Sequence, residues 1–261
     1  MNIPSPEQVQ MRFGDIYIDS LNRAQLRVPF DNLDGGTRVL RNEAECISYI
    51  ALYGGHHFYK LYKAYTSTGF ENTEGKNVEI IDWGCGQALA TCVLIDYLID
   101  RNISLDVSSI TLVEPSIVAL ERGFSLVQLM FQNDASIYSA VRQVNKYLDD
   151  LNPADFVSQT NSIKFHLFSN ILDVEGFDLQ QLYQLMVNSF QGLNRIVCTS
   201  PRGQQRLEMF YSHFLQSHQV VEASSSSQAI SGEVFWAASG KRERRPISRC
   251  ERQFTVDLTQ C

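Results

Sequence analysis

A short run at positions 78–91 combines an acid, two glycines and a helix start in a pattern that suits a nucleotide-type ligand. A hydrophobic segment ends on Asp82, and Gly84 and Gly86 lead from it into an apolar segment that predicts a helix. Glycine adopts positive φ angles and lets a ligand reach the main chain without meeting a Cβ atom. The first turn of the helix offers unpaired N–H groups and the positive end of its dipole. A strand, a glycine turn and a helix N-terminus in this order predict a nucleotide-type site.

The spacing of the glycines decides between kinds of nucleotide. The dinucleotide fingerprint requires a third small residue five positions after its first glycine, and Leu89 occupies that place. The phosphate loop G-x-x-x-x-G-K-[ST] is absent from the sequence. The carboxylate of Asp82 would also repel a pyrophosphate at the end of the strand. It would suit a ligand with positive charge, such as an ammonium or a sulfonium group.

The run resembles the first motif of the class I S-adenosylmethionine (SAM)-dependent methyltransferases, acid-x-Gly-x-Gly-x-Gly. Asp82, Gly84 and Gly86 match this motif, and Ala88 stands in place of its third glycine. A second landmark of the family is an acid at the end of the next strand. Glu114 follows the next apolar segment and precedes a proline that stops it. The chain therefore carries two family landmarks in the right order.

The resemblance implies a cofactor, SAM, and the residues that hold it. Glu114 would accept hydrogen bonds from both ribose hydroxyls. The carboxylate of Asp82 would interact with the positively charged methionine end of SAM. The predicted cofactor-binding residues are Asp82, Trp83, Gly84, Cys85, Gly86, Glu114, Pro115 and Asn170. The resemblance covers roughly residues 78–221, and it identifies no subfamily.

Three further side chains are candidates for catalysis. Asn170 matches the first position of the Asp/Asn-Pro-Pro-Tyr/Phe motif of the DNA amino-methyltransferases, which resemble this fold. Ile171 and Leu172 replace the two prolines, which disfavours methylation of an exocyclic base nitrogen. His56 and His57 are candidates because histidine ordinarily titrates near neutral pH and can move a proton. Packing of the histidines on a helix, and capping of a strand end by Asn170, are the alternatives. Because methyl transfer needs mainly alignment, the catalytic residues stay unassigned.

The chain divides into an N-terminal arm with a helical cap at 1–75 and a SAM-binding, methyltransferase-like domain at 76–261. Prolines and a glycine turn at 1–38 favour an arm or a lid. A helix is expected at 42–66, interrupted by the pair Gly54-Gly55. Its N-cap is expected at Asn42, with a glutamate three residues later.

Beyond residue 76, strand-like and helix-like segments alternate, which predicts an α/β fold with a doubly wound, mostly parallel sheet, the Rossmann-like methyltransferase fold. The expected strands lie at 78–81, 110–113, 163–173 and 195–200, and the expected helices at 88–99, 117–131, 179–190 and 204–216. Three last strands, at 220–223, 232–238 and 253–258, have no helices between them and predict an antiparallel C-terminal addition. The apolar rhythm of 137–151 predicts a helix where the family usually has a strand that helps to hold the adenine.

The composition is typical of a globular protein without a membrane span. Hydrophobic residues make up 44% and charged residues 20% of the 261 residues, which is ordinary, and no apolar run is long enough to span a bilayer. The first residues lack the layout of a signal peptide, so a cytoplasmic protein is expected. The six cysteines include no C-x-x-C pair, and no Cys/His spacing predicts a metal site.

The net charge of −7 argues against a general nucleic-acid surface. One stretch, 241–252, is an exception with six basic and two acidic residues. It is interpreted either as a solvated loop between the two last strands or as an edge that contacts an acidic or nucleic-acid partner.

The function that these observations favour is transfer of a methyl group from SAM to an acceptor that the sequence does not identify. We expect the acceptor to be held by the helical segment around His56 and His57 and by the stretch 241–252. The alternative is a catalytically inactive binding or regulatory protein with a methyltransferase fold. Ala88, the missing adenine strand and the lack of an obvious catalytic residue motivate this alternative. A dinucleotide oxidoreductase is a third hypothesis.

Overall fold

The computed structural model describes residues 2–4, 11–24, 33–34, 36–131, 136–201 and 203–259. The centre of the molecule is a seven-stranded sheet in the order β3-β2-β1-β4-β5-β9-β6. Its strands are β1 (Asn77–Trp83), β2 (Asp106–Val113), β3 (Val141–Val144), β4 (Ile163–Ser169), β5 (Leu193–Ser200), β6 (Val220–Ser226) and β9 (Cys250–Asp257). Strands β1 to β5 pair in parallel, and β9 is antiparallel to both β5 and β6. The predicted α/β class, with a mostly parallel sheet and antiparallel C-terminal strands, is confirmed.

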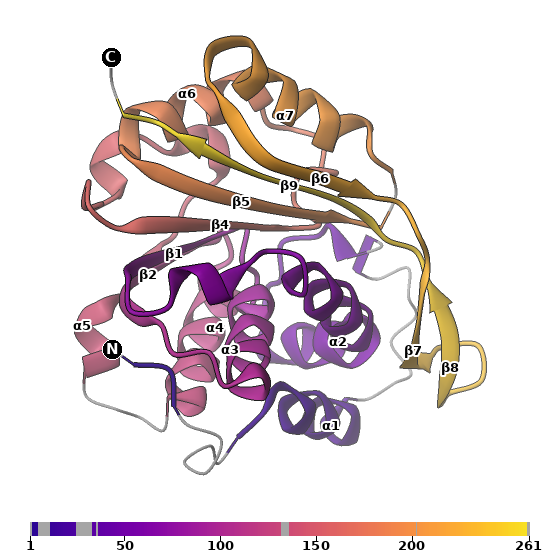
Figure 1. Ribbon diagram of the computed structural model, residues 1–261. Coiled ribbons are helices and arrows are strands. Elements are labelled where there is room, and N and C mark those ends of the chain that lie inside the picture. Colours follow the sequence, from indigo (N-terminus) through magenta and orange to yellow (C-terminus); the bar gives the residue numbers. More distant parts are fainter. Residues whose placement is uncertain are drawn as a thin grey trace.

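Helices cover both faces of the sheet (Figure 1). One face carries α1 (Phe13–Arg23), α2 (Glu43–Tyr65), α3 (Leu89–Arg101) and α4 (Ile117–Met130), and the other carries α6 (Leu179–Ser189) and α7 (Gln205–Ser217). Two large clusters of buried apolar side chains fill the spaces between these layers and the sheet. Because β1, β2 and β4 are parallel, their carboxyl ends meet at one edge of the sheet, which is where open α/β sheets bind ligands.

Residues 137–151 do not form the predicted helix. The short helix α5 (Ser136–Ala140) ends where β3 begins, and β3 pairs in parallel with β2. In β3 the two valines are buried and the two residues between them are exposed. This spacing of apolar residues is also that of one face of a helix, which explains the wrong prediction. The strand that the sequence did not reveal is therefore present, and it is followed by the short turns η3 (Leu148–Asp150) and η4 (Pro153–Asp155).

The helix α2 begins where the sequence predicts, and the Oδ1 atom of Asn42 accepts a hydrogen bond of 2.9 Å from the N–H of Glu45. The predicted interruption at Gly54-Gly55 is wrong, because α2 continues through both glycines. The glycines serve close packing instead. A Cβ atom on Gly55 would lie only 3.0 Å from the hydroxyl oxygen of Tyr17. They therefore let α1 lie directly on α2.

The predicted N-terminal arm is in part a helix of the core. Within α1, Phe13, Ile16 and Tyr17 are buried in the same apolar cluster as α2 and α3. The carboxylate of Asp96 on α3 accepts a 2.9 Å hydrogen bond from the backbone N–H of Phe13, which fixes the start of α1. Part of 1–38, including the middle residue of the predicted Asp34-Gly-Gly36 turn, lies outside the described residues.

Replacement of Gly55 by leucine should destabilise the protein by about 1–3 kcal/mol, because extra carbon atoms would be forced against Tyr17. Gly14→Ala on α1 is the control, since a Cβ atom on Gly14 would meet no described residue within 4 Å. It should instead stabilise the protein by about 0.5–1 kcal/mol, the helical penalty of glycine. Urea unfolding of both variants measures the difference. Equal effects of the two substitutions would show that the α1–α2 contact is loose.

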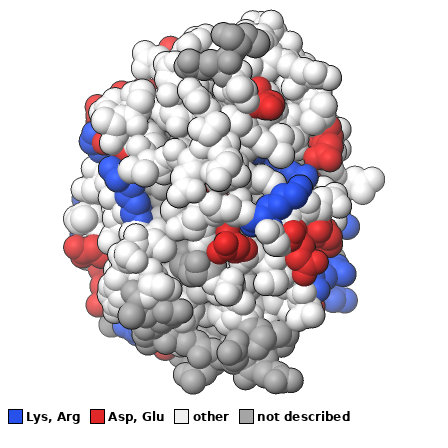
Figure 2. Space-filling view, turned by 60° about the vertical axis from the view of Figure 1, so that its left-hand side comes forward, with Lys and Arg blue, Asp and Glu red and all other residues white. Residues whose placement is uncertain are grey.

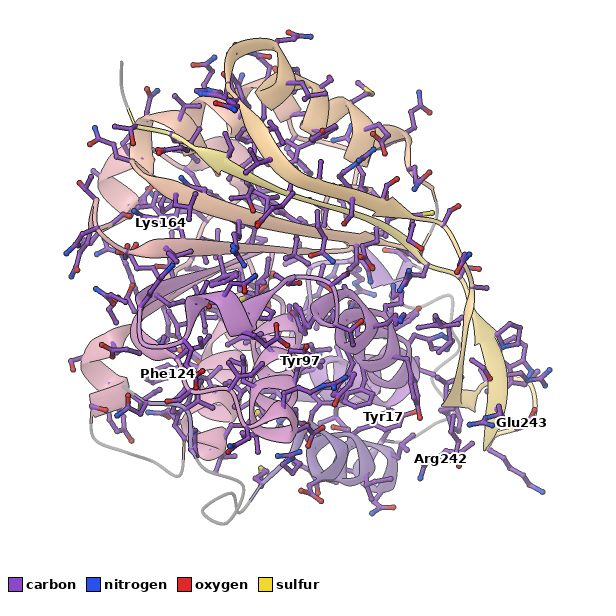
Figure 3. All side chains as sticks on the ribbon, in the orientation of Figure 1. Tyr17, Tyr97, Phe124, Lys164, Arg242 and Glu243 are labelled. Carbon is purple, nitrogen blue, oxygen red and sulfur yellow. The ribbon has the colours of Figure 1, made fainter. Side chains whose placement is uncertain are left out.

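The stretch 241–252 is not the predicted solvated loop. Strand β8 (Lys241–Ile247) pairs with β7 (Ile230–Trp236) as an antiparallel hairpin, separate from the main sheet and inserted between β6 and β9. Figure 1 shows this hairpin beside α2 and α1. Gly232 permits the close approach, because a Cβ atom there would lie 2.3 Å from the ring of Tyr59. The backbone N–H of Phe235 donates a 2.9 Å hydrogen bond to the hydroxyl of Tyr17. Figure 3 shows the side chain of Tyr17 near that of Arg242.

Several of the basic side chains of this stretch already have acidic partners. Arg242 lies 3.3 Å from a carboxylate oxygen of Glu233, and Arg245 lies 2.6 Å from one of Glu243. Arg252 forms an ion pair with Glu208 on α7. On the face shown in Figure 2, acidic and basic side chains also lie close together. Binding of an acidic or nucleic-acid partner at 241–252 stays a prediction. None of the described helices is both long and apolar enough to cross a bilayer.

Candidate functional site

The glycine turn joins β1 to α3 through an unusual backbone path. The φ angles of Gly84, Gly86 and Ala88 are 58°, 53° and 57°, all in the left-handed region that favours glycine. A Cβ atom on Gly84 would lie 2.6 Å from the side chain of Ile171, whereas one on Gly86 would meet nothing within 4 Å in the described part of the chain. The main chain at Gly86 is therefore open to a ligand. Ala88 keeps a backbone conformation suited to the glycine that it replaces in the motif.

Asp82 stabilises the turn through hydrogen bonds to Thr91 at the start of α3. Its Oδ2 atom accepts hydrogen bonds of 3.1 Å from the backbone N–H and 2.8 Å from the hydroxyl of Thr91. The side chain is buried, and burial raises the pKa of the carboxyl group to about 7. Among the described residues its Oδ1 atom has no hydrogen-bond partner. The acid that ends β1 thus ties the strand to the first turn of α3.

Glu114 lies at the end of β2 and reaches across to the glycine turn. Its Oε2 atom accepts a 3.0 Å hydrogen bond from the N–H of Gly86, and its Oε1 atom accepts one of 2.9 Å from the N–H of Ser116. Glu114 is buried, and only 8% of it is exposed. Burial raises the pKa of this carboxyl group. Because a carboxylate has about four lone-pair sites, both oxygens keep room for another donor.

A cavity of about 340 Å³ opens at the carboxyl ends of β1, β2 and β4, and we call it the glycine-turn cavity. Its lining includes five of the predicted cofactor-binding residues, Gly84, Gly86, Glu114, Pro115 and Asn170. The segment 146–149, which follows β3, forms another part of the lining. The sequence did not reveal this segment as part of the site, because the apolar pattern of 137–151 predicts a helix. The pattern of a short buried edge strand gave no separate signal.

The other three predicted cofactor-binding residues do not line this cavity. Cys85 is buried, with its backbone N–H donating a 2.9 Å hydrogen bond to the carbonyl of Val113. Trp83 is fully buried and stacks on Phe168 with ring centroids 5.5 Å apart. Its Nε1–H donates to Nδ1 of His166 at 3.1 Å. Together with Asp82, these two residues support the turn from the core, and their contact with a cofactor stays a prediction.

The catalytic candidates His57 and Asn170 meet in one polar cluster. Asn170 follows β4 with a φ angle of 62°, a strained conformation of the kind that concentrates at functional sites. Its Nδ2 atom lies 3.2 Å from Nε2 of His57. His57 is also hydrogen-bonded to the hydroxyls of Tyr49 and Ser169, each at 3.1 Å. Burial lowers the pKa of His57 well below its usual value, so this imidazole is neutral and held in place by its partners.

Lys60 belongs to the same cluster and was missed from the sequence. Its Nζ atom donates a 2.7 Å hydrogen bond to Oδ1 of Asn170. The residue is only 2% exposed, and burial lowers the pKa of its ammonium group to about 7. Lysine is almost never fully buried without a partner. A signal was available in its spacing, because Lys60 lies one helical turn after His56 and His57 and therefore shares their face of α2.

A second cavity, of about 370 Å³, lies next to this cluster, and we call it the hairpin cavity. Its lining comes from α2, from the loops after β4 and β5, and from the hairpin, and includes His56, His57, Lys60, Asp173, Trp236 and Pro246. The two segments that were expected to hold an acceptor, around His56 and at 241–252, both contribute to it. Gly36, Thr37, Tyr49 and Asn170 line both cavities. The two spaces are therefore neighbours.

Comparison with known proteins identifies the fold. No family model and no curated protein matches the sequence. Among solved structures, the plantazolicin methyltransferase BpumL in complex with SAH has a TM-score of 0.51 at 8% identity and covers 95% of this chain and 98% of its own. A SAM-dependent O-methyltransferase from Thermotoga maritima has a TM-score of 0.45 at 11% identity, over 76% of this chain and 65% of its own. A SAM-dependent methyltransferase from Leishmania major has a TM-score of 0.46 at 9% identity, over 93% and 82%.

This chain has the Rossmann-like fold of the class I SAM-dependent methyltransferases. The resemblance that Asp82, Gly84, Gly86 and Glu114 carry in the sequence is confirmed at the level of the fold, without a subfamily.

Proposed function

We propose that this protein binds SAM in the glycine-turn cavity and transfers its methyl group to an acceptor in the hairpin cavity. The observation that carries the proposal is the placement of Glu114. Its buried carboxylate lines the cavity at the end of β2 and accepts a hydrogen bond from the N–H of Gly86 in the turn after β1. The acid and the turn that the sequence pattern pairs thus lie in direct contact. Such a place, beyond the carboxyl ends of parallel strands, binds nucleotides in this class of sheet.

The residues present fit SAM. The main chain at Gly86 has open space where a Cβ atom would lie, so the cofactor can lie against it. Glu114 retains acceptor sites for hydroxyl donors, which suits a ribose. The segment 146–149 and Pro115 line the part of the cavity near β3, where we place the adenine. SAM supplies a methyl group on a positively charged sulfur.

Two of the three features that motivated the hypothesis of an inactive protein no longer support it. The strand thought to be missing is β3, and the residues after it line the cavity. Ala88 adopts the positive φ angle of a glycine, so the turn keeps its path. The third reason was the lack of a catalytic residue, and Lys60, His57 and Asn170 form a buried polar cluster between the two cavities. Turnover is therefore part of the proposal.

Calorimetry with SAM and with its demethylated product, S-adenosylhomocysteine, tests the cofactor site directly. We expect both to bind with one site per chain, and NAD(H) not to bind. Methyl transfer is then followed by release of S-adenosylhomocysteine in the presence of candidate acceptors. Failure to bind either SAM or its product would refute the proposal. Binding without turnover on any acceptor would favour a regulatory protein.

Glu114→Ala should weaken SAM binding by about 1.5–3 kcal/mol, the range for losing hydrogen bonds to a charged group. This corresponds to a loss of affinity of roughly 10- to 150-fold. Glu121→Ala is the control, because Glu121 is an exposed glutamate on α4 and should leave affinity unchanged. Calorimetry measures both variants after circular dichroism has shown that they are folded. An unchanged affinity of the folded Glu114 variant would move the ribose to another place.

A further inference from the structure

The two cavities meet at the residues that they share. Asn170 and Tyr49 line both the glycine-turn cavity and the hairpin cavity. If SAM fills the first, its methyl group must leave through this junction to reach an acceptor in the second. The groups at the junction are therefore those that can act on the atom that receives the methyl group. Lys60 is one of them, because its Nζ atom lies 2.7 Å from Oδ1 of Asn170 and it lines the hairpin cavity.

Lys60 has an incomplete set of partners. An ammonium group has three N–H donors, and among the described residues the only hydrogen bond of Nζ is the one to Asn170. Among the described residues, no carboxylate oxygen lies within 4.0 Å of the Nζ atom of Lys60, so Lys60 forms no ion pair with them. A buried cation is costly when it is not paired. An amine in this place is suited either to lose its proton or to meet a negatively charged atom of a ligand.

The charged groups around Lys60 do not remove this need. Asp173, in the loop after β4, acts on it electrostatically, as does Cys250 at the start of β9. The carboxylate of Asp173 already accepts a hydrogen bond from the hydroxyl of Ser200. On α2 itself, His56 and His57 have lowered pKa values, because of burial and the nearby Lys60. The wall therefore offers a protonated or neutral amine and one engaged acid, which disfavours an acceptor that carries an ammonium group.

Much of the remaining wall of the hairpin cavity is aromatic or apolar. Tyr49 and Tyr53 lie on α2 with ring centroids 5.1 Å apart, and Trp236, Pro246 and Ile247 come from the hairpin. Flat rings favour stacking against another flat ring. The volume of about 370 Å³ is at the lower end of the range for small-molecule sites. The volume and the lining suit a small aromatic molecule.

We propose that the acceptor is a small aromatic molecule with a hydroxyl group, and that Lys60 takes the hydroxyl proton at the junction of the two cavities. This inference rests on the proposed function, and it specifies the acceptor class and one catalytic residue of that reaction. The neutral amine of Lys60 accepts the proton from the hydroxyl oxygen. The oxygen then forms a bond to the methyl carbon, the carbon–sulfur bond breaks, and its electron pair stays on sulfur. The proton leaves Lys60 to water afterwards.

The acid–base properties of Lys60 agree with this role. Burial lowers the pKa of its ammonium group to about 7, so a substantial fraction of the amine is neutral at physiological pH. General bases work best when their pKa lies near the working pH. Asn170 holds Nζ in place through its 2.7 Å hydrogen bond, and His57 contacts Asn170 from the other side. These two residues position the base.

Two phenols test the proton transfer. The hydroxyl of 4-methylphenol needs a base at neutral pH, whereas much of 4-nitrophenol is ionised without help. We expect the wild-type protein to methylate both. Lys60→Met should slow methylation of 4-methylphenol by about 100-fold or more, the usual contribution of a general base, and should slow methylation of 4-nitrophenol much less. Equal slowing of both phenols would overturn the role of Lys60 as a base.

A spectroscopic measurement needs neither SAM nor turnover. Bound 4-nitrophenol should be shifted towards its yellow phenolate in the wild-type protein, because the proton moves to Lys60. Lys60→Met should abolish the shift. Lys60→Arg keeps the positive charge but cannot accept a proton, so it should bind the phenolate and still fail to methylate 4-methylphenol. An unchanged shift in the methionine variant, or full activity of the arginine variant, would refute the proposal.

Calorimetry with SAM separates this inference from the proposed function. Lys60 does not line the glycine-turn cavity, so both Lys60 variants should bind SAM as the wild-type protein does, which also shows that they are folded. If the wild-type protein binds SAM but methylates neither phenol, the acceptor class is wrong and the proposed function stands. If it does not bind SAM, the proposed function fails, and this inference fails with it.

Discussion

Gly86→Val is expected to reduce SAM affinity by about 100-fold or more while the chain still folds. The φ angle of Gly86 is 53°, and a β-branched residue in this region is strained by roughly 1–2 kcal/mol. None of the described residues other than the chain neighbours lies within 4 Å of the added Cβ atom, so the side chain would occupy the glycine-turn cavity rather than the core. The loss of binding should come mainly from exclusion of the ligand. Calorimetry with SAM measures it.

Gly75→Val is the matched control for this substitution. Gly75 has a φ angle of 71°, a Cβ atom there would also meet nothing within 4 Å, and the residue is exposed outside the cavity lining. Both variants should therefore lose a similar amount of stability, roughly 1–2 kcal/mol, as measured by urea unfolding. Only the Gly86 variant should lose SAM. Normal SAM binding by Gly86→Val would mean that the glycine turn is purely structural.

Lys60→Met is expected to make the protein more stable at pH 6 and to flatten its stability between pH 7 and 10. The pKa of Lys60 falls from 10.5 to about 7 on folding, so between these values the unfolded chain binds more protons. Stability from this group therefore rises with pH through this window and is lowest below pH 7. At about 1.4 kcal/mol for each pKa unit, the penalty below pH 7 is about 5 kcal/mol.

Part of this gain is offset in the variant. Methionine leaves Oδ1 of Asn170 without its donor, at a cost of about 1–3 kcal/mol. The net gain at pH 6 is therefore about 3 kcal/mol, and above pH 10 the variant should be the less stable protein. Lys63→Met, at an exposed position of the same helix, should change stability by less than about 0.5 kcal/mol. Urea unfolding at pH 6 and 10 measures both. A less stable Lys60 variant at pH 6 would show that the ammonium group is well accommodated.

The alternation of strands and helices was predictable from the pattern of apolar residues along the sequence. In most elements this pattern is typical either of a strand or of a helix. Strands β1, β2, β4 and β5 are mostly buried, and each carries a group of large apolar residues. The first motif and Glu114 were predictable for a different reason. A turn with positive φ angles and an acid at a strand end need particular residues at particular positions.

The errors arose where two structures share one pattern. Val141 and Val144 are buried in a strand of four residues, yet their spacing is equally that of a helix. Gly54 and Gly55 can end a helix or let another helix approach, and the choice depends on Tyr17, a distant residue. Lys60 illustrates the same limit for the site. Its burial follows from the way α2 packs against the end of β4 and the hairpin, which no local pattern contains.

The hairpin of β7 and β8 has a consequence for how substrate preference can change. The hairpin lies between β6 and β9 in the sequence and forms a separate two-stranded sheet. The hydroxyl of Tyr17 on α1 accepts a hydrogen bond from it. Glu114 and the glycine turn lie on the main sheet itself. An insertion of this kind can vary in length and sequence without disturbing the strands at which we propose that SAM binds. Under the proposed function, exchange of residues 230–247 for the corresponding segment of a methyltransferase of similar fold would give a new acceptor range and leave the proposed SAM site unchanged.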